Sequence, residues 1–174
     1  MSFRDLCVIS VITLSLIVYS VSAYAQTNPP SGGFTKDALM NANYQGWFDF
    51  KNGRFEDEEA QITVDIMEIV FGDLNHDGVD DAVIVYNMLS NHEFNGIAVV
   101  LNDHGKPKYI DQTGYERSEP VEKVVIKDGI ISVYSKTRRP IQPMASDLTV
   151  PVVYKYKVVG NKLVELSKKK TVYR

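Results

Sequence analysis

Short turn sequences between apolar, strand-forming runs are the feature that most constrains the fold of this chain. Asn52-Gly53 lies between Phe50 and Phe55, and this dipeptide suits the positive φ angles of a two-residue hairpin turn. The same arrangement recurs at three places, with turns expected at 103–105, Asp128-Gly129 and Gly160-Asn161. The chain is therefore predicted to form a series of antiparallel hairpins.

Apolar and polar residues alternate in several of these runs. Val124 and Ile126, for example, alternate with Lys123 and Lys127, which indicates a strand with one buried and one solvated face. Typical strand lengths of about 5 to 6 residues give roughly seven to nine strands. We therefore expect an α+β, mostly β fold built on one twisted antiparallel sheet of hairpins.

A helix and a long loop are expected at the two places where the strand pattern is missing. The Thr35 hydroxyl can cap a short N-terminal helix over 36–40. The stretch 137–148, which contains Pro140 and Pro143, is expected to be a long loop between strands. Residues 34–174 are thus predicted to form a single globular β-rich domain.

The N-terminus has the features of a secretory signal peptide over residues 1–25. An apolar run from Leu6 to Val21 follows Arg4 and leads to the small-residue site Ala23-Tyr24-Ala25. The alternative is an uncleaved anchor, but the run is shorter than the about 20 apolar residues that span a bilayer and contains three serines. We expect a periplasmic or secreted protein with no membrane span after cleavage, and a flexible Pro- and Gly-rich leader at 26–33.

The cysteine content and the charge narrow the possible classes further. The only cysteine, Cys7, lies within the predicted signal peptide, so the exported chain would have no disulfide and no thiol nucleophile. The formal net charge is −3, which gives no argument for a nucleic acid or an anionic membrane surface as partner. The basic clusters Arg138-Arg139 and 168–170 are interpreted as solvated ends of elements.

An acidic loop with a central glycine precedes the most apolar run, in the stretch GDLNHDGVDDAVIVY. Oxygen-bearing side chains stand at loop positions 1, 3, 5 and 9, Gly78 stands at position 6, and a backbone carbonyl is available at position 7. This spacing suits a short loop wrapped around Ca²⁺, which needs oxygen ligands on alternate residues and a glycine for the sharp turn. The predicted ligands are Asp73, Asn75, Asp77, the carbonyl of Val79, and Asp81.

The loop is not a complete EF-hand. Position 12 is Ile84, where an EF-hand has a bidentate glutamate, and the residues that follow the loop form a strand pattern. Asp80, at position 8, is expected to point outward and is not counted as a ligand. The alternative is a turn whose aspartates accept hydrogen bonds from their own backbone amides without an ion.

The loop resembles the Asp-x-Asn-x-Asp-Gly-x-x-Asp calcium loops of FG-GAP and VCBS-type repeats and, more distantly, those of dockerins and thrombospondin type 3 repeats. The wider pattern from Leu39 to Leu166 resembles a group of small exported bacterial proteins with one such loop. The resemblance implies Ca²⁺ ligation by the five ligand residues named above. Because the chain has a single loop, a propeller of several blades is not expected and a single-sheet domain is preferred.

No catalytic residue is assigned from the sequence. The three histidines, His76, His92 and His104, form no His-x-His or His-Glu-x-x-His motif, and the chain has no Gly-x-Ser-x-Gly elbow. Tyr154 and Tyr156 share one face of a predicted strand, so both rings are either core residues or an exposed pair suited to a carbohydrate or a peptide.

The function expected from these features is that of an exported protein with a structural calcium ion. We interpret it as a binding or accessory module with a protein, peptide or glycan partner. The alternative is a cell-envelope hydrolase or inhibitor, which a cleft joining His92 or His104 to a buried carboxylate would favour.

Overall fold

The structure, a computed structural model, describes residues 33–116, 119–139, 143 and 146–170. The predicted signal peptide and residues 26–32 of the predicted leader lie outside the described residues. In the described part of the chain, no helix has the length and hydropathy that a membrane crossing requires.

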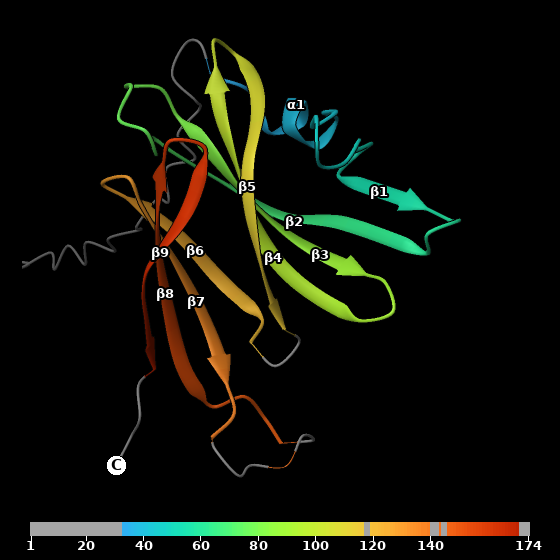
Figure 1. Cartoon of the computed structure of the whole chain (residues 1–174), viewed down its shortest axis with the longest axis vertical. Coiled ribbons are helices and arrows are strands. Elements are labelled where there is room, and N and C mark those ends of the chain that lie inside the picture. The colour runs from blue at the N-terminus through green and yellow to red at the C-terminus, as the bar shows by residue number, and fades with distance from the viewer. Residues whose placement is uncertain (1–32, 117–118, 140–142, 144–145, 171–174) are drawn as a thin grey trace, which may run out of the picture.

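Strands dominate the described residues and form two antiparallel sheets, one of which curls strongly (Figure 1). The first sheet contains β1 (Arg54–Asp57), β2 (Ile62–Gly72), β3 (Asp81–Leu89), β4 (Glu93–Asp103) and β5 (Lys106–Glu116). The second sheet contains β6 (Val121–Lys127), β7 (Ile130–Thr137), β8 (Val150–Val159) and β9 (Lys162–Lys170). Within each sheet, every strand pairs with the next one in the chain, so each sheet is a meander.

The predicted mostly β class is confirmed, but the prediction of a single sheet is wrong. The reason lies in β3, where every residue from Asp81 to Tyr86 is buried. Successive side chains of a strand point to opposite faces, so a strand buried throughout needs a covering layer on each face of its sheet. The chain supplies the second sheet for one face and the segment 34–50 for the other.

The main core lies between the two sheets. The first sheet contributes Val83, Val85, Ile97, Val99 and Tyr115, and the second contributes Val124, Ile131, Val133, Val152, Tyr154, Tyr156 and Val158. Both rings of the Tyr154 and Tyr156 pair are buried here. The alternative of an exposed aromatic pair for a carbohydrate or peptide is therefore wrong.

A second core covers the opposite face of the first sheet. The helix α1 (Lys36–Met40) begins as predicted, because the Oγ1 of Thr35 accepts a hydrogen bond of 3.1 Å from the Ala38 N–H. Aromatic residues that follow the helix pack on Tyr86 and Tyr109, and the Trp47 and Tyr109 rings stack with their centroids 5.3 Å apart. These N-terminal aromatic residues thus serve the core.

The predicted turns are confirmed by their backbone angles, although Asn52-Gly53 closes an isolated bridge between Lys51 and Arg54 rather than a pair of strands. The φ angles are 52° and 77° at Asn52 and Gly53, 54° and 83° at His104 and Gly105, and 52° and 70° at Asp128 and Gly129. Gly160, with φ of 59°, turns the chain between β8 and β9. Of the predicted loop 137–148, Thr137 still belongs to β7, and the other described residues up to 148 belong to no strand.

Replacing the buried Phe50 with alanine should lower the free energy of unfolding by about 3–5 kcal/mol, because the missing ring leaves a cavity. Urea unfolding followed by fluorescence of the only tryptophan, Trp47, measures the change. Met67→Ala is the control, since Met67 is 66% exposed and its loss should cost no more than about 0.5 kcal/mol. Equal effects of the two substitutions would show that segment 34–50 does not cover the sheet.

Candidate metal centre

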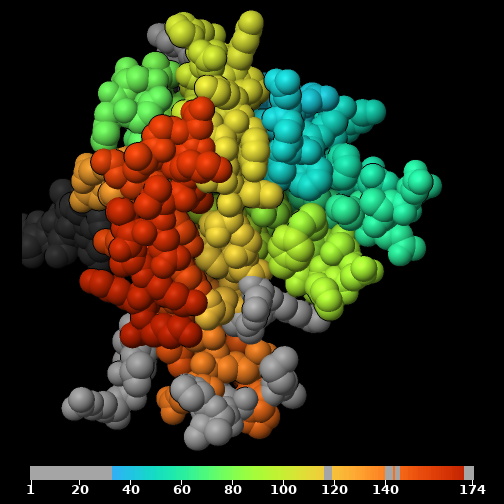
Figure 2. Space-filling model, viewed as in Figure 1, coloured from blue at the N-terminus to red at the C-terminus, as the bar shows by residue number. Residues whose placement is uncertain are grey.

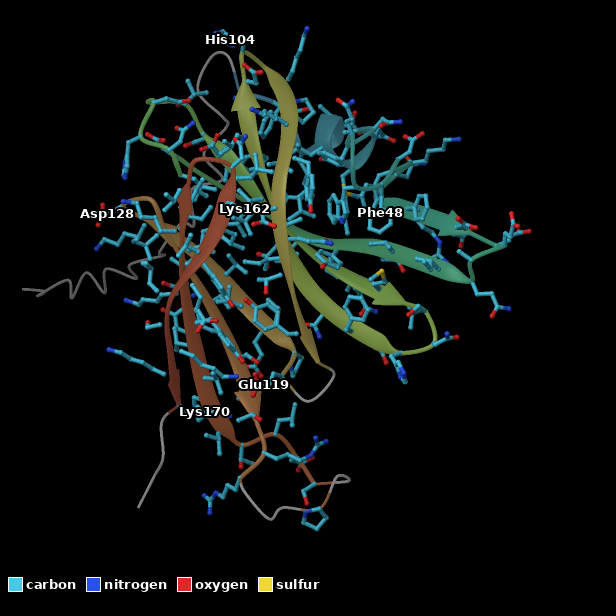
Figure 3. All side chains as sticks on the ribbon, viewed as in Figure 1. Phe48, His104, Glu119, Asp128, Lys162 and Lys170 are labelled. Atoms are coloured by element: carbon cyan, nitrogen blue, oxygen red, sulfur yellow. The ribbon has the colours of Figure 1, made fainter. Side chains whose placement is uncertain are left out.

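The acidic loop lies where the two sheets meet. It joins the paired ends of β2 and β3, at Gly72 and Asp81. A Cβ atom on Gly72 would lie 2.7 Å from the Cγ2 of Ile126, so only glycine lets this end of β2 approach β6 so closely. Figure 3 shows the loop between the β4–β5 turn, labelled at His104, and the β6–β7 turn, labelled at Asp128.

The loop folds around the carboxylate of Asp73. Its Oδ1 accepts hydrogen bonds from the N–H groups of His76, at 2.7 Å, and Asp77, at 3.3 Å. Its Oδ2 accepts from the Gly78 N–H at 3.1 Å. The chain can turn this sharply because His76 and Gly78 both have positive φ angles, of 63° and 85°.

Asn75 and Asp77 are bonded to each other on this loop. The side-chain amide of Asn75 donates to the Oδ2 of Asp77 at 2.8 Å, and its Oδ1 accepts from the Asp77 N–H at 3.0 Å. The Oδ1 of Asp77 in turn accepts from the Val79 N–H at 2.8 Å. The side chains at loop positions 1, 3 and 5 are therefore held by one hydrogen-bond network.

Asp81 is the buried member of the predicted ligand set. Its side chain is inaccessible to solvent, and its two oxygens accept from the N–H groups of Leu74 and Asn102, each at 2.9 Å. Burial raises the pKa of Asp81, the two N–H donors lower it, and the charges of Asp77 and Asp73 raise it again, so the pKa lies above its usual value. This carboxylate would be stabilised by a cation.

Asn102 also fixes the loop in place, although no sequence motif marks it as a functional residue. This buried residue donates from Nδ2 to the Asp80 carbonyl at 3.3 Å, and its Oδ1 accepts from the Gly105 N–H at 2.7 Å. Only the turn-forming Asn-Asp-His-Gly sequence marks its position. Its contacts with residues 80 and 81 come from the pairing of β3 with β4.

The predicted ligands are close in space, but the Ca²⁺ site stays a prediction. Across the residues that the structure describes, no three His, Cys, Asp or Glu side chains converge as a metal-binding group. The carboxylates instead accept backbone N–H groups, as the alternative without an ion also requires. The donor set itself consists of hard oxygen atoms, which fits Ca²⁺ chemically.

The histidines do not assemble a catalytic group within the described residues. His104 lines a hollow of about 570 Å³ beside the loop, but its side chain is 97% exposed and its Nδ1 lies 2.7 Å from the exposed carboxylate of Asp103. His92 is exposed at the β3–β4 turn. Neither residue pairs with a buried carboxylate among the described residues. The structure therefore does not show the cleft, joining a histidine to a buried carboxylate, that would favour a hydrolase.

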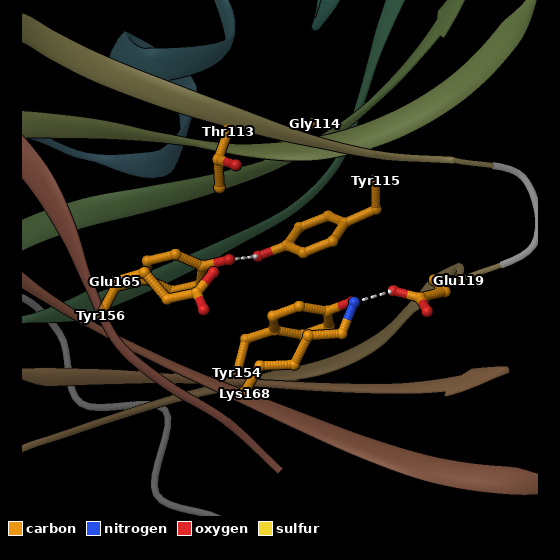
Figure 4. A pocket seen from close by; sticks show the side chains of 8 residues that line it. All are labelled: Thr113, Gly114, Tyr115, Glu119, Tyr154, Tyr156, Glu165 and Lys168. Carbon is orange, nitrogen blue, oxygen red and sulfur yellow. Dashed lines mark hydrogen bonds and ion pairs between the residues drawn. The ribbon is translucent and has the colours of Figure 1, made fainter. Parts of the chain in front are cut away.

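A second pocket, of about 320 Å³, lies between β5 and β9 (Figure 4). The hydroxyl of Tyr115 donates to that of Tyr156 at 2.9 Å. The ammonium of Lys168 lies 3.0 Å from a carboxylate oxygen of Glu119 and 4.7 Å from the centre of the Tyr154 ring. This β5–β9 pocket is lined by Thr113, Gly114, Tyr115, Glu119, Tyr154, Tyr156, Glu165 and Lys168.

Several polar groups of the β5–β9 pocket form hydrogen bonds or ion pairs with one another. Burial raises the pKa of both Tyr115 and Tyr156, so the two hydroxyls stay protonated. Burial alone would raise the pKa of Glu119, but Lys168 and Lys170 outweigh it and the pKa lies below its usual value. We interpret these contacts as a connection between the edges of the two sheets.

Comparisons with protein-family models, with curated proteins and with solved structures found no match for this chain. The interpretation of the loop therefore depends on its own residues.

Replacing Asp81 with alanine should lower the free energy of unfolding by about 2–6 kcal/mol even without calcium. The change leaves two buried N–H groups, of Leu74 and Asn102, without their acceptors, at about 1–3 kcal/mol each. Urea unfolding in the presence of a chelator measures the difference. Asp80→Ala is the matched control, and a similar loss in both variants would contradict a special role for the Asp81 carboxylate.

Replacing Glu119 with glutamine should destabilise the protein by about 0.5–1 kcal/mol at pH 7 and by less near pH 3. Because the pKa of Glu119 is lower in the folded protein, its ion pairs stabilise the fold above the unfolded pKa of about 4.3, and this contribution is lost as the pH falls through the folded pKa. Denaturant unfolding at the two pH values measures it.

Glu165→Gln is the control for this experiment. Glu165 lines the same β5–β9 pocket but forms no ion pair with a described residue. A Glu119→Gln effect that stays constant between the two pH values would contradict the ion-pair interpretation.

Proposed function

We propose that this chain is an exported calcium-binding protein in which the ion stabilises the loop between β2 and β3. The observation that carries the proposal is the set of oxygen side chains on alternate residues from Asp73 to Asp77, followed by the buried carboxylate of Asp81 on the same loop. Two of these carboxylates raise the pKa of the third, so a divalent cation would relieve an existing repulsion.

The hydrogen bonds within the loop are compatible with this ion. An ionised carboxylate has two oxygens with about four lone-pair sites, so even the Asp73 side chain, which accepts three N–H groups, keeps a site for a cation. The hydrogen bonds from backbone N–H groups to Asp73 and Asp77 would then orient the carboxylates before the ion binds. The side-chain carbonyl of Asn75 and the backbone carbonyl of Val79 would complete the protein ligands.

The loop chemistry favours Ca²⁺ over Mg²⁺. Calcium accepts six to eight oxygen ligands in a flexible geometry, whereas magnesium demands a near-ideal octahedron and gives up its water reluctantly. A loop of carboxylate, amide and carbonyl oxygens on a turning backbone meets the first requirement better. Extracellular calcium modules commonly bind at about 10⁻⁴ to 10⁻³ M, so a modest affinity suffices for an exported protein.

The role proposed for the ion is structural. The loop begins where β2 ends and finishes at Asp81, the first residue of the strand buried on both faces. Through Asn102 it is also joined to the β4–β5 turn. An ion here would fix the start of β3 and leave the outer surfaces free, which agrees with a binding or accessory module whose partner is a protein, a peptide or a glycan.

Calcium should raise the melting temperature of residues 26–174. An ion at about ten times its dissociation constant contributes about 1.4 kcal/mol, which corresponds to roughly 3–6 °C for a domain of this size. Differential scanning calorimetry in calcium, in magnesium and in chelator measures the shift. We expect the largest shift in calcium.

Asp77→Ala is the test variant and Asp80→Ala the matched control. The first removes an exposed ligand at loop position 5 and should abolish the calcium shift. The second removes a neighbouring carboxylate outside the ligand set and should retain the shift. If calcium does not shift the melting temperature of the parent protein, or shifts both variants equally, the loop is an ordinary turn and the proposal is wrong.

A further inference from the structure

The two sheets carry opposite charge, although the net charge of the chain is only −3. Residues 33–116, which contain the first sheet, include sixteen Asp and Glu and five Lys and Arg. Residues 119–170, which contain the second sheet, include five Asp and Glu and eleven Lys and Arg. Figure 2 shows the two sheets side by side, so the molecule has an acidic half and a basic half.

Strand register places most of these lysines on one surface. In the second sheet, Val133, Val152 and Tyr154 mark the face that packs on the core, and alternate residues point the other way. The outward residues include seven lysines and one acidic residue, Glu122, which pairs with Lys136. This surface, which we name the basic face, contains Lys123, Lys127, Lys136, Lys155, Lys157, Lys162 and Lys169, interleaved with Tyr134, Val159 and Val164.

Lysines and apolar residues alternate across the strands of the basic face. One row of cross-strand neighbours runs from Lys123 through Tyr134 and Val153 to Lys169. A parallel row runs from Lys127 through Ile130, Lys157 and Val164 in the same way. The exposed fraction is 40% for Tyr134, 57% for Val159 and 40% for Val164.

Most of these lysines have no internal counter-charge. Lys136 pairs with Glu122 at 2.7 Å, and Lys162 lies 3.9 Å from Asp111. Within the described residues, no ion pair is formed by the other five lysines of the basic face, which are Lys123, Lys127, Lys155, Lys157 and Lys169. Like charges on one sheet face repel each other, so an external anionic surface would stabilise this arrangement.

We propose that the basic face docks the protein on an anionic lipid surface. Juxtaposed lysines attract acidic headgroups, and the exposed Tyr134, Val159 and Val164 between them suit the boundary between headgroups and acyl chains. A sheet face offers an extended surface rather than a groove. The two hollows described above are lined by residues outside the basic face.

The charge distribution also sets the orientation on the lipid. The acidic half is repelled by anionic headgroups while the basic face is attracted, so the molecule would bind with the first sheet away from the membrane. The acidic loop, which belongs to that half, would then remain accessible. The proposal does not require calcium, so binding to lipid in the presence of a chelator can be measured separately from calcium binding.

Co-sedimentation with lipid vesicles tests the proposal on residues 26–174, because every strand and both cores lie within this segment and the apolar run Leu6–Val21 is excluded. The vesicles contain phosphatidylcholine alone or with about one-third phosphatidylglycerol, in chelator. We expect binding only to the anionic vesicles. Raising the salt from about 0.05 M to 0.5 M should release the protein, because the shorter Debye length screens the attraction between the lysines and the lipid headgroups.

The test variant replaces Lys123, Lys127, Lys155 and Lys157 with glutamine, and each change should weaken vesicle binding by roughly fivefold. The matched control replaces the four exposed lysines of the acidic half and should change binding by no more than about twofold. These control positions are Lys36, Lys51, Lys106 and Lys108. Melting temperatures equal to that of the parent establish that both variants fold, and K155Q/K157Q is tested if the quadruple variant does not.

Three outcomes would overturn the proposal. The first is equal binding to neutral and anionic vesicles. The second is equal loss of binding in the test variant and in the control. The third is binding to heparin or to a DNA duplex, abolished in the test variant, with no binding to anionic vesicles, because the basic face would then recognise a soluble polyanion.

Discussion

The burial of β3 on both of its faces determines how the other elements are arranged. From Asp81 to Tyr86 every residue is inaccessible or nearly so, and alternate side chains enter two different cores. One core needs the second sheet and the other needs segment 34–50, so the molecule has three layers rather than one. The hydrophobic effect thus determines both the number of sheets and the use of the N-terminal aromatic residues.

The candidate metal centre lies at the start of this strand. Asp81 is both the last predicted ligand of the loop and the first residue of β3, and its buried carboxylate connects Leu74 of the loop with Asn102 of β4. Any ion bound by the loop would therefore act directly on the packing of the most buried strand. This connection gives a physical reason why a loop of surface aspartates would influence the stability of the whole domain.

The second sheet contributes a core on one face and a charged surface on the other. Its inward residues pack on the first sheet, and the hydrogen bond between Tyr115 and Tyr156 joins β5 to β8. Lysine is the most frequent of its outward residues. The packing of the two sheets therefore determines which face of the second sheet is exposed to solvent. That exposed face carries positive charge.

The strand pattern, the glycine-containing turns and the acidic loop are predictable from the sequence, because they depend on neighbouring residues. Asn52-Gly53 and Asp128-Gly129 turn as predicted, and the Thr35 cap forms. The second sheet, the hydrogen bond from Asn102 to Asp81 and the common face of lysines far apart in the chain follow from the folded structure alone. Such features depend on which strands pair and pack although they lie far apart in the chain. A local sequence pattern or a net charge contains no information about these long-range contacts.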